Sequence, residues 1–272
     1  MVELGAADVL ELAALPSSVG WHDTVEDWRV ITACARVFGH RDGERLLSCG
    51  ALVDFGEVAW VAKMVVRPEA QRRGLGAAVL ERVLGAARAD AVVGLVATAM
   101  GAPVYARAGF VEVGRVCKMM TPEGLGPGPG PRGVAALAGQ EAAVRAIDRA
   151  VFGADRGRML GPRMAQARRG VVVRVGAAVV GWGLAVAQRE LTVIGPVHAP
   201  DAEVALALVG ALAEGAPGRL RIDVPAEHAG LVAALAARGF LEVDRQAVMT
   251  LDARALPGQR ARLFALASQA FG

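Results

Sequence analysis

The sequence predicts an α/β protein built from two tandem units, and three observations support this prediction. First, an apolar strand over residues 58–66 leads through a glycine-containing loop into a helix. Second, residues 122–133, PEGLGPGPGPRG, hold too many prolines and glycines to continue a helix or a strand. Third, the segment ARAGFVEV at 106–113 matches AARGFLEV at 236–243, an offset of 130. We therefore expect a first domain over 1–121, a linker over 122–133 and a second domain over 134–272.

The composition supports two folded domains and excludes several classes of protein. The chain has 272 residues, and its hydrophobic fraction of 54% can build cores without disulfides or metals. The net charge is +3 and no basic run is interleaved with aromatic residues, which disfavours nucleic-acid binding. Three widely spaced cysteines form no CxxC pair, and no His-x-x-x-His occurs. We therefore expect neither a metal site nor a disulfide framework.

No stretch of the sequence predicts a membrane segment. The N-terminus is acidic and lacks the basic-then-apolar pattern of a signal peptide. The longest apolar run, Val204 to Ala213, is far shorter than the roughly 20 residues that a membrane span needs. We therefore expect a soluble, cytoplasmic monomer or homodimer that binds neither membrane nor nucleic acid.

The elements of the first unit follow from caps, breakers and apolar spacing. Thr24, followed by two acidic residues, predicts a helix N-cap with acids in the first turn. Apolar residues at helical spacing from Val79 to Ala87 predict a helix with one buried stripe. The expected elements are a strand at 2–4, a helix from about 8 to 15, a helix from 24 to about 36, a hairpin turn at 41–44, strands at 45–53, 58–66 and 92–97, helices after 74 and at 102–107, and a final strand pair over 110–121.

The stretch from Gln71 to Ala77, which we call the cradle, has the features of a diphosphate site. Gly74 and Gly76 let the backbone bend tightly and approach a ligand closely. The first N–H groups of the following helix lack intrahelical partners and lie at the positive end of its dipole. Arg72 and Arg73 can add charge-assisted hydrogen bonds to the same anion. The spacing fits neither a P-loop nor a dinucleotide-binding fingerprint, because no Lys-Ser/Thr pair follows and Val79 stands where the latter needs Gly or Ala.

Two motifs resemble those of the GNAT superfamily of N-acetyltransferases. The coenzyme A motif of that family, Gln/Arg-x-x-Gly-x-Gly/Ala after a Val-x-Pro strand end, is similar to Gln71-Arg-Arg-Gly74-Leu-Gly76 after Val66-Arg-Pro68. The family also often shows Tyr-x-x-x-Gly-Phe about thirty residues later, and Tyr105 to Phe110 matches this pattern. Tyr105 is the only tyrosine in the chain. The resemblance implies two tandem GNAT-like units, each a mixed, mostly antiparallel central sheet flanked by helices.

The resemblance also implies a cofactor site and a reaction. Acetyl-CoA is expected as co-substrate, with no metal, and Tyr105 is expected to give a proton to the departing CoA thiolate, since a phenol stays protonated at neutral pH. One N–H group of the strand Met64–Val66 is expected to polarise the thioester carbonyl. The residues expected to bind the cofactor are Met64, Val65, Val66, Gln71, Arg72, Arg73, Gly74, Leu75, Gly76 and Ala77.

The acceptor side of the reaction stays open at this point. The segment Gly20 to Trp28 resembles a Gly-Trp-x-x-Thr-x-x-Asp-Trp segment near the start of two-unit GNAT proteins, and Trp21, Glu26, Asp27 and Trp28 are its candidate substrate-binding residues. Both tryptophans can equally be core anchors. The general base is a carboxylate in the family, and a histidine is a further possibility. The candidates here are Asp23, Glu26, Asp27, Asp54, Glu57 and His22.

The second half repeats the first without its chemistry. Where the first unit has the cradle, the second has residues 197–203, VHAPDAE, which contain no glycine and no arginine. Leu235 stands in the tyrosine position. We therefore expect that this unit binds no CoA, and it could serve as a lid, a dimer surface or a partner-binding module. The apolar stripe Leu263 to Ala267 is expected to form a terminal strand or to line the acceptor pocket.

The predicted function is acetyl transfer from acetyl-CoA to a primary amine of a small molecule or protein, by direct attack. An alternative is a non-catalytic acyl-CoA sensor or partner-binding module on the same scaffold. A structural interaction protein with an accidental cradle is a third possibility.

Overall fold

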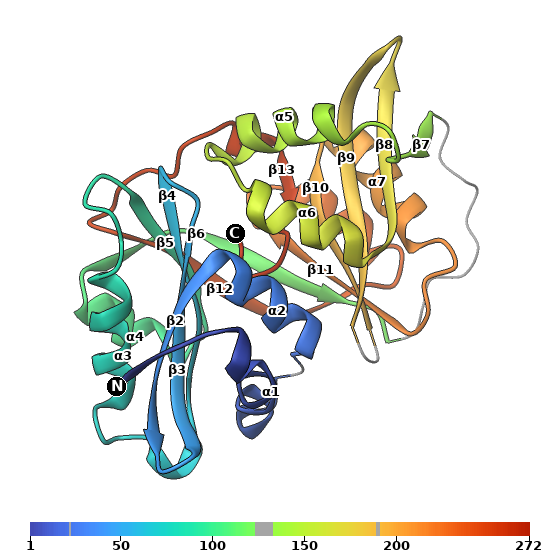
Figure 1. Cartoon of the computed structure of the whole chain (residues 1–272). Coiled ribbons are helices and arrows are strands. Elements are labelled where there is room, and N and C mark those ends of the chain that lie inside the picture. The colour runs from blue at the N-terminus through green and yellow to red at the C-terminus, as the bar shows by residue number, and fades with distance from the viewer. Residues whose placement is uncertain (22, 123–132, 189–190) are drawn as a thin grey trace.

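The structure is a computed structural model, and it describes residues 1–21, 23–122, 133–188 and 191–272 (Figure 1). Within these residues thirteen strands form one continuous sheet in the order β1-β2-β3-β4-β5-β12-β6-β11-β10-β9-β8-β7, and β13 pairs with β10. We call β1 to β6 with α1 to α4 the front unit, and β7 to β13 with α5 to α8 the rear unit. Neighbouring strands are antiparallel except for β4 with β5 and β10 with β11, which confirms the predicted fold class.

The elements of the front unit lie close to their predicted places. Thr24 caps α2 as expected, and strand 58–66, strand 92–97 and helix 102–107 have their predicted bounds. The prediction that α2 reaches Arg36 was wrong, because the strand β2 begins at Ala35 and was missed. The front elements are β1 (Val2–Leu4), α1 (Val9–Ala14), α2 (Val25–Cys34), β2 (Ala35–Asp42), β3 (Arg45–Asp54), β4 (Val58–Val66), α3 (Leu75–Leu84), β5 (Val92–Ala97), α4 (Ala102–Arg107) and β6 (Phe110–Met120).

The rear unit repeats the alternation of strands and helices. Its elements are β7 (Val134–Ala136), α5 (Glu141–Phe152), α6 (Gly157–Gln166), β8 (Ala167–Val175), β9 (Ala178–Gln188), β10 (Leu191–His198), α7 (Ala202–Ala213), β11 (Arg219–Pro225), α8 (Ala229–Ala236), β12 (Leu241–Leu251) and β13 (Leu263–Ala265). The short strand β13 lies inside the apolar stripe for which a terminal strand was predicted. Most of the proposed linker, residues 123–132, lies outside the described residues.

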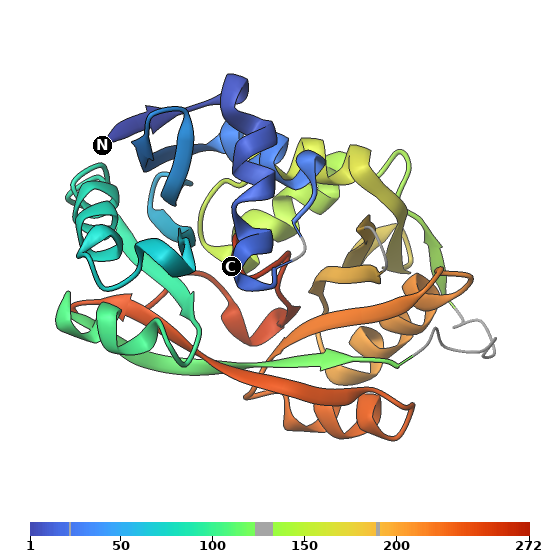
Figure 2. The ribbon, with the colours of Figure 1, turned by 90° about the horizontal axis from the view of Figure 1, so that it is seen from below.

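The two units exchange a strand. β12 belongs to the rear half of the chain but pairs with β5 and β6 of the front unit, and β6 pairs on its other side with β11 (Figure 2). The prediction of a strand pair over 110–121 was wrong, because β6 is one continuous strand from Phe110 to Met120. A tight hairpin needs residues with positive φ, and Gly114, the glycine inside β6, does not have one. The domain boundary that the sequence predicts at 121 does not interrupt the sheet.

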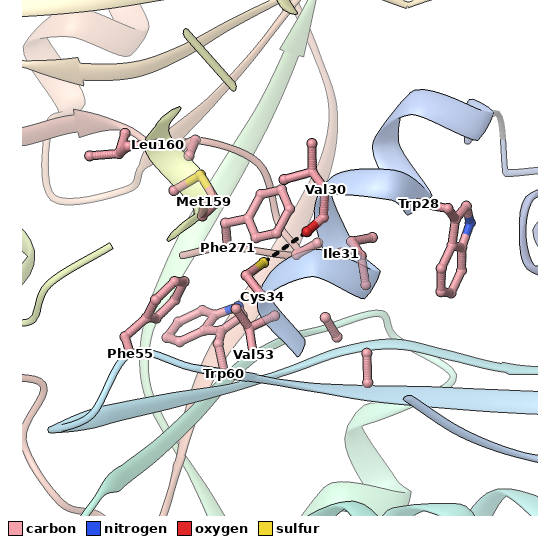
Figure 3. Packing of buried hydrophobic residues seen from close by; sticks show 14 of the residues in the cluster. Trp28, Val30, Ile31, Cys34, Val53, Phe55, Trp60, Met159, Leu160 and Phe271 are labelled. Atoms are coloured by element: carbon pink, nitrogen blue, oxygen red, sulfur yellow. Dashed lines mark hydrogen bonds between the residues drawn. The ribbon is translucent and has the colours of Figure 1, made fainter. Parts of the chain in front are cut away.

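A shared hydrophobic core holds the units together. One cluster joins Trp28 and Trp60 of the front unit with Trp182 and Phe152 of the rear unit and with Phe271 near the end of the chain. Figure 3 shows Trp28, Trp60 and Phe271 in this cluster. All five side chains are at most 2% exposed. Burial of one large apolar side chain contributes about 1.5–3 kcal/mol, so this cluster stabilises the units against separation. The second face of the front sheet packs on α3 and α4, and that of the rear sheet packs on α7 and α8.

All three cysteine side chains lie inside the protein. Cys34, Cys49 and Cys117 are buried and free, and burial raises the pKa of Cys34 to about 12. No helix in the described part of the chain has the length and apolar character to span a bilayer. The described residues also contain no group of three His, Cys, Asp or Glu side chains that could hold a metal.

A buried histidine gives the rear unit a pH-dependent stability. His198 is fully buried 3.5 Å from Asp148, and burial lowers its pKa to about 3. In the unfolded chain a histidine has a pKa of about 6.5. Between these values the unfolded chain binds one proton more than the native chain, so the free energy of unfolding falls by about 1.4 kcal/mol per pH unit as the pH is lowered.

We predict that His198→Phe removes this contribution. In urea unfolding between pH 4.5 and pH 7.5, the wild type should lose stability toward acid more steeply than the variant. The difference in slope should approach about 1.4 kcal/mol per pH unit below pH 6. His40 and His228 are present in both proteins and cancel in the comparison. Equal slopes would show that His198 is not held neutral in the native state.

Candidate active site

The cradle follows directly from the end of β4. A short 3-10 turn at Pro68–Ala70 reverses the chain, and the Gln71 side chain donates a hydrogen bond to the Val66 carbonyl at 3.1 Å. Arg72 and Gly74 have φ angles of 60° and 79°, which twist the backbone into the start of α3. The glycine meets this requirement without strain. The turn therefore holds residues 71–74 in front of the first N–H groups of α3.

No anionic side chain among the described residues caps the N-terminus of α3. Gly74 is the N-cap, and in the described part of the chain the helix start has no side-chain capping hydrogen bond. Arg72 and Arg73 are exposed, and neither forms an ion pair with the described residues. Leu75 and Gly76 are half-buried and Ala77 is exposed at the same helix start. Two exposed arginines therefore directly precede the positive end of the α3 dipole.

The strands β4 and β5 pair over only three residues. Val58, Ala59 and Trp60 pair in parallel with residues 92–94, and beyond that point the edge of β4 facing β5 has no strand partner among the described residues. A bulge lies just past this point, where Lys63 has a φ of 53° and the register with β3 shifts. Residues Met64 to Val66 follow the bulge and lead into the cradle. The open edge leaves backbone groups of β4 available to a bound ligand.

Tyr105 lies on the face of the sheet covered by α3 and α4. Its ring packs edge-to-face on Phe110, with centroids 5.9 Å apart, and its side chain is 9% exposed. Burial raises the pKa of Tyr105 to about 12. The phenol is therefore protonated over the whole physiological pH range and can act as a proton donor.

Asp27 holds the two units together at the start of α2. It forms a capping box with Thr24, and it also accepts hydrogen bonds from Arg163 and Gln188 of the rear unit at 2.9 Å. Burial alone would raise the pKa of Asp27, but Arg163 and Thr24 outweigh it and hold the pKa below its usual range. Removal of one partner from such a buried pair costs about 3–5 kcal/mol, so Asp27 has a structural role.

The other proposed acceptor residues, Trp21, Glu26 and Trp28, range from fully buried to exposed. The Trp28 indole is fully buried in the shared core, which is the core-anchor alternative, and Trp21 packs against the edge of the same core. Glu26 is more than half exposed and pairs with Arg29 at 2.9 Å. A pocket of about 450 Å³ lies where α2 meets the rear unit, and it is lined by Thr24, Val25, Glu26, Asp27, Gln166, Val186 and Ala187.

Asp23 is the candidate base nearest to the bulge of β4. Its Oδ1 accepts from the Lys63 ammonium at 2.5 Å, and its Oδ2 is buried with no hydrogen-bond partner among the described residues. Asp54 and Glu57 lie instead at the turn before β4, at the far end of the strand from the bulge. His22 lies outside the described residues.

Two residues of this region escaped the sequence analysis. Lys63 is one of only two lysines in an arginine-rich chain, which could have drawn attention to it. Arg163 carried no such signal, because its partner Asp27 is 136 positions away.

In the rear unit, the helix start that corresponds to α3 follows a shorter connection and already has a side-chain cap. Three residues, 199–201, connect β10 with α7, whereas eight, 67–74, connect β4 with α3. Asp201 caps α7, and its carboxylate accepts from the Val204 N–H at 2.9 Å. Leu235, in the position that corresponds to Tyr105, is fully buried.

Comparison with protein families agrees with both units. Two different models, each described as an acetyltransferase (GNAT) domain, match residues 32–112 and residues 144–265. The chain therefore belongs to the GNAT acetyltransferases, carries two GNAT domains in tandem and is an acyltransferase enzyme.

Individual relatives match this chain over nearly its whole length. The chain is 29% identical over 278 residues to the uncharacterized N-acetyltransferase YitH of Bacillus subtilis (strain 168), and the match covers all of this chain and 98% of that protein. A putative acetyltransferase from Pyrococcus horikoshii superposes with a TM-score of 0.84 at 20% identity, over 100% of this chain and 95% of that one. A tandem GNAT protein from the clavulanic acid biosynthesis pathway gives a TM-score of 0.65 at 19% identity, over 93% and 98% of the two chains. At these identities the two structures establish the fold alone.

Proposed function

We propose that the front unit transfers an acetyl group from acetyl-CoA to a primary amine by direct attack, and that the rear unit binds no coenzyme. The observation that carries this proposal is the contrast between two helix starts. Within the residues that the structure describes, no side chain caps the N-terminus of α3 and the two arginines before it form no ion pair. The N-terminus of α7, in contrast, is already capped by the carboxylate of Asp201. A diphosphate fits the first site and is repelled from the second.

The coenzyme would lie along the open edge of β4. Its diphosphate would be bound by the N–H groups of α3 and by Arg72 and Arg73, and its pantetheine amides would pair with residues 64–66. The thioester would then lie near the bulge at Lys63, where an N–H group of β4 would stabilise the developing oxyanion.

Asp23 and Tyr105 are proposed to move the two protons of the reaction. The Asp23 carboxylate takes a proton from the ammonium form of the acceptor, and the freed amine nitrogen attacks the thioester carbon. The C–N bond forms, the C–S bond breaks, and Tyr105 gives its proton to the departing thiolate. The second proton of the acylated nitrogen is then lost to solvent to give the amide, and the Tyr105 phenolate takes up a proton from solvent again. Two observations support these roles: Oδ2 of Asp23 is buried and accepts no hydrogen bond from the described residues, and the Tyr105 phenol is protonated.

The pocket beside α2 is the proposed route of the acceptor to this site. Asp23 precedes Thr24, which lines the pocket, and Asp23 reaches back to Lys63 on β4. Both acidic side chains of the pocket already have cationic partners, since Arg163 pairs with Asp27 and Arg29 pairs with Glu26. We therefore propose a small primary amine rather than a polycation as the acceptor class.

The first test of this function combines coenzyme binding with turnover. Wild type should bind acetyl-CoA in calorimetry and release free thiol with at least one member of a panel of primary amines. Arg72→Ala/Arg73→Ala should weaken acetyl-CoA binding by at least about tenfold, because charge-assisted hydrogen bonds to the diphosphate are lost. Arg238→Ala, a change at an exposed arginine of the rear unit, is the control and should bind normally. Absence of acetyl-CoA binding in the wild type would contradict the proposal.

Tyr105→Phe tests the proton donor. The phenyl ring keeps the packing on Phe110 and loses only the hydroxyl group. We expect kcat at neutral pH to fall by about a hundredfold or more, the usual range for loss of a general acid, with unchanged affinity for acetyl-CoA. Because the pKa of Tyr105 is raised to about 12, the wild type should show no loss of rate from phenol ionisation up to pH 10. Unchanged turnover in the variant would remove Tyr105 from the mechanism.

Asp23→Asn tests the base, and two other carboxylates serve as its controls. The amide retains the shape of the side chain but cannot accept the ammonium proton, so kcat should fall by about a hundredfold. The lowered kcat of Asp23→Asn should rise again toward high pH, because there the acceptor amine loses its proton in solution. Asp54→Asn and Glu57→Gln, at the far end of β4, should behave as wild type. A larger loss in either control than in Asp23→Asn would assign the base elsewhere.

A further inference from the structure

The gap between β10 and β11 is filled by the chain itself. These strands pair in parallel from Leu191 to Ile194 and then separate, as β4 and β5 do in the front unit. We call the space beyond Ile194 and Ile222 the rear slot, and residues 257–272 the tail. The tail strand β13 enters this slot and pairs with β10.

Backbone hydrogen bonds join the tail to both sides of the rear slot. On the β10 side, Ala265 lies opposite Val197 and the Ala199 N–H donates to the Arg262 carbonyl at 3.1 Å. On the β11 side, the Leu266 N–H donates to the Asp223 carbonyl at 3.0 Å. The tail thus satisfies backbone groups that the separated strands cannot satisfy with each other.

Side-chain burial and a close backbone approach at Gly195 also hold the tail in the rear slot. Residues Leu263 to Ala267 are at most 5% exposed, and Phe264 stacks on the His228 ring with centroids 3.9 Å apart. His228 Nε2 also lies 2.9 Å from the Leu263 carbonyl oxygen. A Cβ atom at Gly195 would collide with the Leu266 carbonyl oxygen, and its three nearest atoms all belong to the tail. The absence of a side chain at 195 lets the tail approach this closely.

We infer that the rear slot is a binding site for an extended peptide strand, and that its ligand is the tail of the same chain. The slot recognises backbone amides through β-pairing and apolar side chains through burial, as in other cases of strand addition. The proposed function says only that the rear unit binds no coenzyme. The tail is what occupies the rear slot instead.

The tail continues from the rear slot to the front unit. The Trp60 indole N–H donates to the Gln269 carbonyl at 3.0 Å, and Phe271 packs among Cys34, Met159 and Trp60 (Figure 3). The buried Arg156 guanidinium donates to the Phe271 and Gly272 carbonyl oxygens. Trp60 is the last residue of β4 that pairs with β5. Occupation of the rear slot therefore positions the segment that packs where the front strands begin to separate.

Gly195→Ala in the full-length chain tests the inference, with Gly210→Ala as the matched control. The first change places a methyl group against the Leu266 carbonyl, and the second lies on an exposed face of α7 with no atom nearby. By hydrogen-exchange mass spectrometry, residues 259–272 should exchange at least about tenfold faster in Gly195→Ala than in wild type, while Gly210→Ala should match wild type. Slow exchange of this segment in a folded Gly195→Ala protein would overturn the inference.

A cross-link keeps the inference testable if Gly195→Ala does not fold. Val197→Cys/Ala265→Cys places two thiols on residues that lie opposite each other across β10 and β13. The oxidised protein should form this disulfide, and failure to form it would overturn the inference.

Coenzyme A is the probe that tests whether the rear slot can also bind a coenzyme. Native mass spectrometry should find one coenzyme per chain in the wild type, in the cross-linked protein and in Gly195→Ala. A second coenzyme in Gly195→Ala would show that the slot is still a coenzyme site. Binding of no coenzyme at all would contradict the proposed function, but the exchange and cross-linking results for the tail would stand.

Discussion

Backbone groups left unpaired where two parallel strands separate are the constraint on which both units depend. A buried N–H or C=O group without a partner is costly, so each separation needs an occupant. In the rear unit the occupant is the tail, which bonds to β10 and β11. In the front unit no strand of the described chain pairs with that edge of β4 beyond Trp60. One architectural feature thus gives a closed structural joint in one half and a proposed coenzyme site in the other.

The loops that follow the separated strands reinforce this division. An eight-residue connection with Gly74 leaves the start of α3 uncapped, and a three-residue connection with Asp201 caps α7. The rear unit nevertheless contributes to the front one, because Arg163 neutralises Asp27 at the start of α2 and the tail packs on Trp60. These contacts make the rear unit a structural support for the region in which we place the chemistry.

The sequence predicted local structure better than the arrangement of the chain. Apolar runs and caps placed β4, β5, α4 and the start of α2, because these signals act within a few residues of the elements that they define. The exchange of β12 was not predictable, because the match between residues 106–113 and 236–243 shows equivalent segments but not the sheet that each one joins. The Asp27–Arg163 pair was equally hidden, since a contact across 136 positions has no local signal. For the site, the cradle and Tyr105 could be named from motifs, but Lys63 and its pairing with Asp23 required the fold.

The exchange of β12 also bears on how the protein is made. β5 ends at Ala97, but the strand that lies beside it begins at Leu241. During synthesis at about 5–20 residues per second, β5 and β6 therefore leave the ribosome several seconds or more before β12, the strand that pairs with both. Unpaired strand edges are templates for association with other chains. A gene fragment that stops in the proline- and glycine-rich segment would lack both β12 and β11, and the edges of β5 and β6 would keep no strand from the rear unit to pair with.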